Sequence, residues 1–127
     1  MAGETDLAAL LRGMKPAIDP RPFNFSTHKE MTLAEGAMRN PIAMFQEPEG
    51  LTLVCEGNAE PRYRMVTLTI HSSLEAVGLT AAVSTALANE QITANVIAAF
   101  YHDHIFVLEA DADRAVIALE KLSKRQA

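Results

Sequence analysis

One stretch, from Tyr63 to Gly78, constrains the fold more than any other part of the chain. Polar and apolar side chains alternate over residues 63–71, which is the period of a β-strand. The aliphatic face of this strand, formed by Val66, Leu68 and Ile70, is expected to pack on helices, and the half-polar face to meet water or another sheet. A short loop over residues 72–77 follows, and Gly78 stands where a helix begins. This loop is the first candidate for a ligand site.

The rest of the C-terminal half predicts helix, strand, strand and helix. We expect a helix over Gly78–Asn89 whose inward face is formed by Leu79, Val83, Ala86 and Leu87. A strand over Thr93–Tyr101, a tight turn at His102-Asp103 and a return strand over His104–Glu109 are expected to follow. The final helix has a buried stripe of Ala112, Ala115, Val116, Leu119 and Leu122. This order is a split βαβ, ferredoxin-like arrangement that lacks its last strand. Because such a sheet leaves an unpaired edge, we expect a strand from the N-terminal half to complete it.

The N-terminal half predicts a smaller α+β unit. Thr5 is expected to cap a first helix, an extended segment to follow over residues 15–19, and a strand to run over residues 23–27. Thr32 and Glu35 have the spacing of a capping box. A hairpin is expected from strands at residues 42–46 and 51–56. Residues 57–61 read as a linker, which divides the chain into an N-terminal half (1–58) and a C-terminal half (59–127).

Composition narrows the classes of partner. The net charge of -5 disfavours nucleic acid and anionic membranes, and no apolar run approaches the roughly 20 residues of a membrane helix. The one cysteine, Cys55, has no partner for an intramolecular disulfide. These features predict a cytoplasmic protein that binds neither nucleic acid nor membrane.

Two clusters of polar residues have the composition of a chemical site. His102, Asp103 and His104 suggest a metal site, but a zinc site needs three or four ligands and no second cluster is present. The segment around Ser72 and Glu75 has hydrolase residue types without a GxSxG elbow or an oriented nucleophile–base pair. We therefore predict no enzyme, no cofactor and no metal. Gly78 is a better candidate, because a helix N-terminus suits a carboxylate and glycine allows a ligand to approach the backbone.

The segments SSLEAVGL and ANVIAAFYHDHIFV resemble small bacterial tandem ACT-domain proteins, which are related to the ACT pairs of aspartokinases and cytosolic arginine sensors. The segments LAALLRGMKPAIDPRPFNFST and NPIAMFQEPEGLTLV resemble the companion half. The resemblance implies ferredoxin-like folds, pairing of ACT units and amino-acid binding at an interface between the units. Together with the strand expected to complete the C-terminal sheet, it predicts two ACT-like halves with strand exchange between them. The ligand-binding residues that it implies are Ser72, Glu75, Ala76, Val77, Gly78, Leu79, Asn95, Val96 and Ile97. Many such loops carry an aspartate before the glycine, whereas Val77 stands there in this chain and Glu75 is the nearest acid.

The predicted function is that of a non-enzymatic ACT-type regulatory protein that binds a free amino acid or a similar small metabolite. With the resemblance, the half-polar sheet face and the alanine-rich helix predict a homo-oligomer, expected to be a dimer, that passes its signal to an unknown protein target. The alternative is a ligand-free module for protein–protein interaction and oligomerisation, which the absence of an aspartate before Gly78 favours.

Overall fold

The computed structural model of the chain describes residue 3 and residues 5–125. The chain forms two compact units, which we call unit 1 (Met1–Pro20 with Arg64–Ala127) and unit 2 (Arg21–Tyr63). Unit 1 therefore combines the N-terminal segment with the C-terminal part of the chain. The predicted boundary between residues 58 and 59 separates two halves of the sequence, whereas these units are defined by proximity in space, so that boundary stays a prediction. Within the described residues, no helix has both the length and the hydrophobicity needed to cross a bilayer.

The sheet of unit 1 has the strand order β1–β5–β7–β6. These strands are β1 (Pro16–Ile18), β5 (Tyr63–Leu68), β6 (Asn95–Ala98) and β7 (Asp103–Leu108). The antiparallel pairing of β1 with β5 places Pro16 opposite Leu68 and Ile18 opposite Val66. A strand from the N-terminal part of the chain thus completes the C-terminal sheet, as predicted from its unpaired edge.

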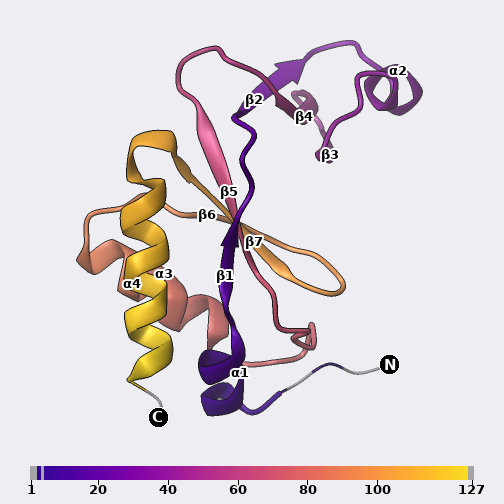
Figure 1. The fold of residues 1–127 in the computed structure, drawn as a ribbon. Helices are drawn as coiled ribbons and strands as arrows, with labels where there is room; N and C mark the ends of the chain where they lie inside the picture. The colour runs from indigo at the N-terminus through magenta and orange to yellow at the C-terminus, as the bar shows by residue number, and fades with distance from the viewer. Residues whose placement is uncertain (1–2, 4, 126–127) are drawn as a thin grey trace. The chain divides into compact units, whose positions relative to one another are not determined.

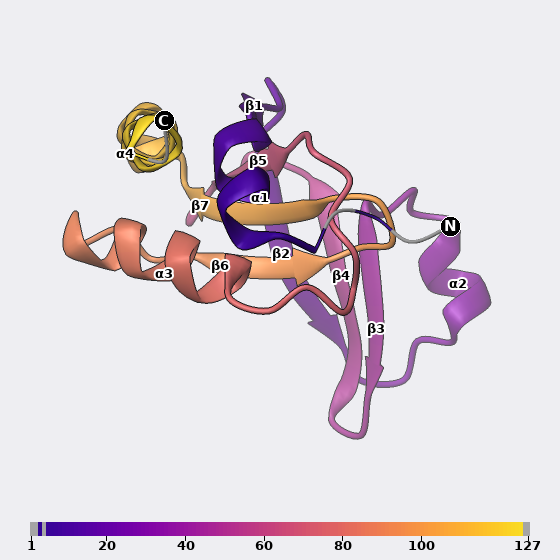
Figure 2. The same ribbon diagram turned by 90° about the horizontal axis from the view of Figure 1, so that it is seen from below.

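Three helices of unit 1 supply the other side of its core. They are α1 (Leu7–Gly13), α3 (Leu79–Asn89) and α4 (Ala112–Lys124). Helices α3 and α4 lie side by side and α1 contacts both (Figures 1 and 2). The strand residues Val66 and Leu68 and the helix residues Leu87 and Leu119 are almost completely buried in one core. Full burial of an aliphatic side chain of this size stabilises the fold by about 1.5–3 kcal/mol.

Periodicity predicted the inward faces of both long helices correctly. On α3 the buried residues are Leu79, Val83, Ala86 and Leu87, as expected. On α4 they are Ala112, Ala115, Leu119 and Leu122, and Val116 is packed against the core although it is only partly buried. A short 3-10 helix, η1 (Glu109–Asp111), leads into α4. An acidic first turn and a basic last turn suit the dipole of α4.

Four local predictions for unit 1 were wrong. The cap of α1 is Asp6 and not Thr5, because the Asp6 side chain accepts hydrogen bonds from the first-turn amides. Strand β5 ends at Leu68 instead of residue 71, and β6 spans only Asn95–Ala98 instead of residues 93–101. The turn lies at residues 99–102, because Ala98 pairs with Asp103, which begins β7. The alternation of polar and apolar residues in the sequence continues beyond the last residue that pairs with a neighbouring strand. A prediction from alternation alone therefore overestimates the length of the strand.

Unit 2 contains a three-stranded antiparallel sheet in the order β3–β4–β2 and one short helix. The elements are β2 (Phe23–His28), α2 (Leu33–Ala37), β3 (Ala43–Glu47) and β4 (Gly50–Glu56). The predicted hairpin and the predicted capping box of Thr32 and Glu35 are both confirmed. Gly36 brings α2 close to β4, because a Cβ at this position would lie 2.6 Å from Leu51 Cδ2.

Candidate functional site

The loop between β5 and α3 is folded by its own polar groups. The Glu75 amide donates to Ser73 Oγ at 3.1 Å, and the Ala76 amide donates to the Ser73 carbonyl oxygen at 3.0 Å. Ser72 is buried, and its hydroxyl donates to Asp103 Oδ2 at 3.3 Å. The loop is therefore joined to the first residue of β7 by a hydrogen bond to a carboxylate.

Gly78 sets the direction in which the chain enters α3. Its φ of +99° lies in the left-handed region, where residues with a side chain are rarely found. As the N-cap of an 11-residue helix, it offers no side-chain hydrogen bond to the first-turn amides. The positive end of the helix dipole is therefore not satisfied by a capping side chain, which is the arrangement that receives anions.

A small cavity of about 70 Å³ lies between this loop, the first turn of α3 and the strands β6 and β7. Its lining residues are Ser72, Ser73, Leu74, Ala76, Leu79, Thr80, Ala98 and Asp103. Three of the predicted ligand-binding residues, Ser72, Ala76 and Leu79, belong to this lining, whereas Glu75, Val77 and Gly78 do not. Their proposed contact with a ligand stays a prediction.

The predicted wall on β6 lies outside this cavity lining. Asn95 donates its side-chain amide to the Phe106 carbonyl oxygen at 3.3 Å. Val96 packs against the core of unit 1, and Ile97 is half-buried. Their neighbour Ala98 lines the cavity instead. The role of these three residues in binding likewise stays a prediction.

Asp103 is the main residue of the lining that the sequence reasoning missed. It was expected in a turn, but its pairing with Ala98 brings both residues to the cavity. The sequence shows Asp103 as an acid between two histidines, which marks it as a candidate site residue. Its position beside the loop, however, depends on the register of β6 with β7, which is set by the length of the turn at residues 99–102.

The two histidines beside Asp103 have separate partners. His102 Nδ1 lies 3.1 Å from the Ile70 carbonyl oxygen, and His104 Nδ1 lies 2.9 Å from Thr67 Oγ1. Burial lowers the pKa of His104, and the positive charge of His102 lowers it further, while Asp103 acts in the opposite direction. In the part of the chain that the structure describes, no three His, Cys, Asp or Glu side chains are grouped to hold a metal ion.

Large apolar side chains are exposed in the same loop and in the neighbouring turn. Leu74 is 65% exposed and Val77 is 83% exposed. In the turn between β6 and β7, Phe100 and Tyr101 are both more than half exposed, and the Tyr101 ring lies 5.0 Å from the His71 ring. We call Leu74, Val77, Phe100 and Tyr101 the apolar rim.

Comparison with known proteins identifies the family. ACT-domain family models match residues 2–62 and residues 59–121. A crystal structure of a protein of unknown function from Vibrio cholerae, described as a possible transport protein, is 47% identical with a TM-score of 0.80. The alignment covers 87% of this chain and 89% of that chain. The chain belongs to the ACT-domain family and is a small protein with two ACT domains in tandem, a class of regulatory modules.

Solved structures of aspartate kinases share its fold. The regulatory subunit of aspartate kinase from Thermus flavus has a TM-score of 0.65 at 10% identity, over 85% of this chain and 96% of that chain. Aspartokinase III from E. coli, in complex with aspartate and ADP, has a TM-score of 0.64 at 15% identity, over 84% of this chain and 32% of that chain. These likenesses support the fold alone, and they agree with the predicted ferredoxin-like α+β class. No curated protein matches the sequence.

Proposed function

We propose that this protein is a non-enzymatic regulator that binds a free amino acid, or a similar small metabolite, at the loop before α3. The observation that carries the proposal is the position of Asp103, which lines the same cavity as the loop and the first turn of α3. A carboxylate on one side and a helix N-terminus on the other are complementary to the two charges of an amino acid.

Each charged group of an amino acid has a partner in this arrangement. The ligand carboxylate meets the amides at the start of α3, after Gly78, where the helix dipole favours negative charge. The ligand ammonium meets Asp103, which already accepts a hydrogen bond from Ser72. Asp103 thereby takes the place of the aspartate that many ACT loops carry before the glycine, where this chain has Val77.

The cavity is too small to enclose such a ligand without a further contribution. Its volume of about 70 Å³ is well below the roughly 300–1,000 Å³ of most ligand pockets. The apolar rim supplies exposed surface at which a second ACT unit can complete the site. We therefore propose a homodimer in which the ACT units have two relative arrangements. The ligand stabilises the arrangement that it binds more tightly, so its binding is coupled to assembly.

The second candidate is a ligand-free interaction module, and the apolar rim is the observation that favours it. Four exposed apolar side chains, of which Leu74 also lines the cavity of about 70 Å³, suit an association surface as well as a ligand site. In either case we propose that the protein acts in the cytoplasm, as the single cysteine suggests, and that its target is another protein.

A thermal-shift panel of the twenty amino acids and common metabolites separates the two candidates. A ligand at about a hundred times its Kd should stabilise the protein by roughly 2.7 kcal/mol. Asp103→Asn should abolish the shift, whereas Asp113→Asn, which removes an exposed acid at the start of α4, should keep it. Sedimentation with and without the hit measures the coupling to assembly. If protein shown to be free of copurified ligand gives a flat panel, the sensor proposal is wrong; a dimer under those conditions supports the interaction module.

A further inference from the structure

Unit 2 contains a larger cavity, of about 420 Å³, that none of the predicted site residues lines. Its volume is within the range of small-molecule sites. The cavity lies between the start of β2, the end of β4 and the segment that joins α2 to β3. Its polar lining residues are Arg21, Arg39, Asn40, Cys55 and Glu56.

The segment after α2 is fixed in place at both ends. At one end, Gly36 holds α2 against β4. At the other, the Ile42 amide donates to the Val54 carbonyl oxygen at 2.7 Å. Between them, Asn40 has a φ of +52°, a left-handed conformation that asparagine tolerates better than most residues. The cavity is therefore bounded by a constrained segment on one side.

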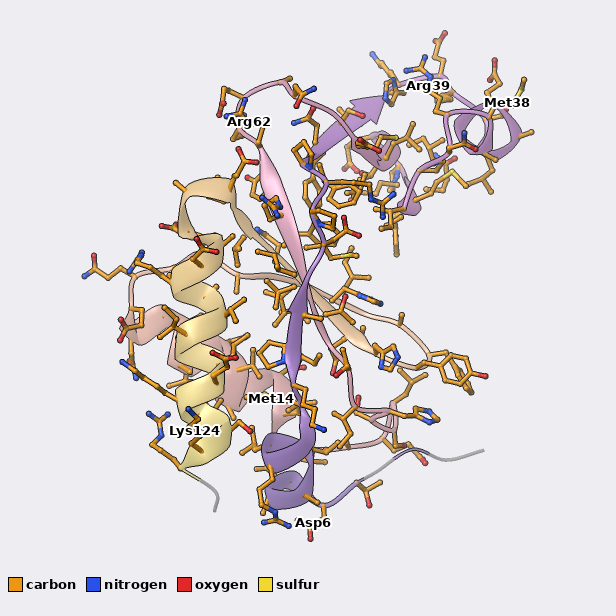
Figure 3. All side chains as sticks on the ribbon, in the orientation of Figure 1. Asp6, Met14, Met38, Arg39, Arg62 and Lys124 are labelled. Carbon is orange, nitrogen blue, oxygen red and sulfur yellow. The ribbon has the colours of Figure 1, made fainter. Side chains whose placement is uncertain are left out.

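The Arg39 guanidinium is available for a ligand although its backbone is engaged. The Cys55 thiol donates to the Arg39 carbonyl oxygen at 3.9 Å. The Arg39 side chain is exposed beside the end of α2 (Figure 3), and among the described residues it has no hydrogen bond or ion pair. A guanidinium presents a planar set of donors that matches a carboxylate with two parallel hydrogen bonds.

The other charged groups of the lining narrow the class of ligand. Arg21 lies over the Phe23 ring at 5.0 Å, so this second cation is held beside the cavity by a cation–π contact. Glu56 is the single acid of the lining, and a ligand that carried only acceptors would be repelled by it. A hydroxyl or ammonium group on the ligand would instead donate to this carboxylate.

We propose that unit 2 binds a small carboxylate that also carries a hydrogen-bond donor, such as a hydroxy acid or an amino acid. The ligand carboxylate binds Arg39, with Arg21 and the side-chain amide of Asn40 beside it, and the ligand donor binds Glu56. This site shares no residue with the loop before α3, so either site can be disproved without the other.

Cys55 provides a built-in reporter for this proposal. It is the chain's single cysteine, it is half-buried, and it lines the cavity. Bound ligand should slow its alkylation by iodoacetamide, by about tenfold when the ligand concentration is ten times its Kd. The probes are L-malate, succinate, potassium phosphate, and potassium chloride at matched ionic strength. We expect L-malate to protect Cys55 at a concentration about tenfold lower than succinate, which lacks the donor for Glu56.

Variants identify which side chains bind the probe. In each variant, protection is the ratio of the Cys55 alkylation rates without and with the probe. Arg39→Gln should abolish protection by L-malate. Lys29→Gln is the matched control, because it removes one positive charge from unit 2 about 20 Å from Phe23, beyond the other end of β2. Glu56→Ala, which removes the acceptor for the malate hydroxyl, should remove the difference between L-malate and succinate.

Four results would overturn the proposal. They are an alkylation rate that no probe changes, protection by potassium chloride equal to that by L-malate, protection that persists in Arg39→Gln, and protection by phosphate that exceeds protection by L-malate. The last would show a site for oxyanions in general, without a role for Glu56. Circular dichroism and the unfolding midpoint of each variant confirm that the comparison is made on folded protein.

Discussion

Replacement of Gly78 by alanine tests whether the left-handed turn before α3 is required by the fold. Its φ of +99° is outside the regions that residues with a Cβ occupy readily. An added Cβ would also lie 3.1 Å from Leu7 Cδ2, which is the movable end of a side chain. We therefore expect backbone strain to dominate the effect, and the contact with Leu7 to relax by a small rotation of that side chain.

The expected loss of stability follows from two opposing terms. A non-glycine residue in this conformation costs about 1–3 kcal/mol. Alanine also restricts the unfolded chain, which returns about 0.4–1 kcal/mol. From the middle of each range, about 2 less about 0.7 kcal/mol, the net loss is about 1.3 kcal/mol, which for a chain of this size lowers Tm by roughly 5 °C.

Urea unfolding measures this loss as a change in midpoint at constant slope. Gly78→Asn is the informative partner, because asparagine is larger than alanine but tolerates left-handed conformations better. If strain decides, the asparagine variant loses less stability than the alanine variant. If the asparagine variant loses more stability than the alanine variant, crowding against Leu7 determines the loss instead. An alanine variant as stable as the wild type would refute the requirement for a positive φ.

Two further predictions concern other polar contacts. Thr32→Ala removes the hydroxyl that accepts from the Glu35 amide at 3.1 Å, so we expect a loss of about 0.5–2 kcal/mol in urea unfolding, which Thr32→Ser should largely restore. Burial lowers the pKa of His104 in the folded state, so the folded protein binds a proton at this residue less readily than the unfolded chain. The stability that neutral His104 contributes is fully present above its ordinary pKa of about 6.5, and it is lost as the pH falls through the lower pKa of the folded state. The unfolding midpoint should therefore fall more between pH 7.5 and 5.5 in the wild type than in His104→Gln, and equal falls would contradict the assignment.

Local rules predicted the elements of this chain well wherever neighbouring residues decide them. The capping box of Thr32 and Glu35 is satisfied within one helical turn, so its spacing was sufficient evidence. The buried faces of α3 and α4 follow from helical periodicity, because one side of each helix must leave water. The cap at Asp6 was missed since two adjacent residues, Thr5 and Asp6, were both suitable by type.

The candidate site was only partly predictable, because its residues come from segments whose distance depends on register. The sequence predicted the loop and Gly78 as a site, since both belong to one strand–loop–helix unit, and Gly78 lies outside the cavity lining. It did not identify Asp103, whose place opposite Ala98 is decided by the pairing of β6 with β7. The same limit applies to Arg39 and Glu56, which line one cavity although 17 positions separate them in the chain.

The sequence by itself determined which segments become strands and helices, the order of those elements and the faces they bury, because periodicity and capping act over a few residues. The resemblance carried by its motifs also indicated the family. Only the tertiary structure decided that β1 completes the sheet beside β5, that Asp103 reaches the loop at Ser72, and that unit 2 contains a cationic cavity. These features depend on strand pairing and on the packing of distant segments, and neither is encoded in the spacing of neighbouring residues.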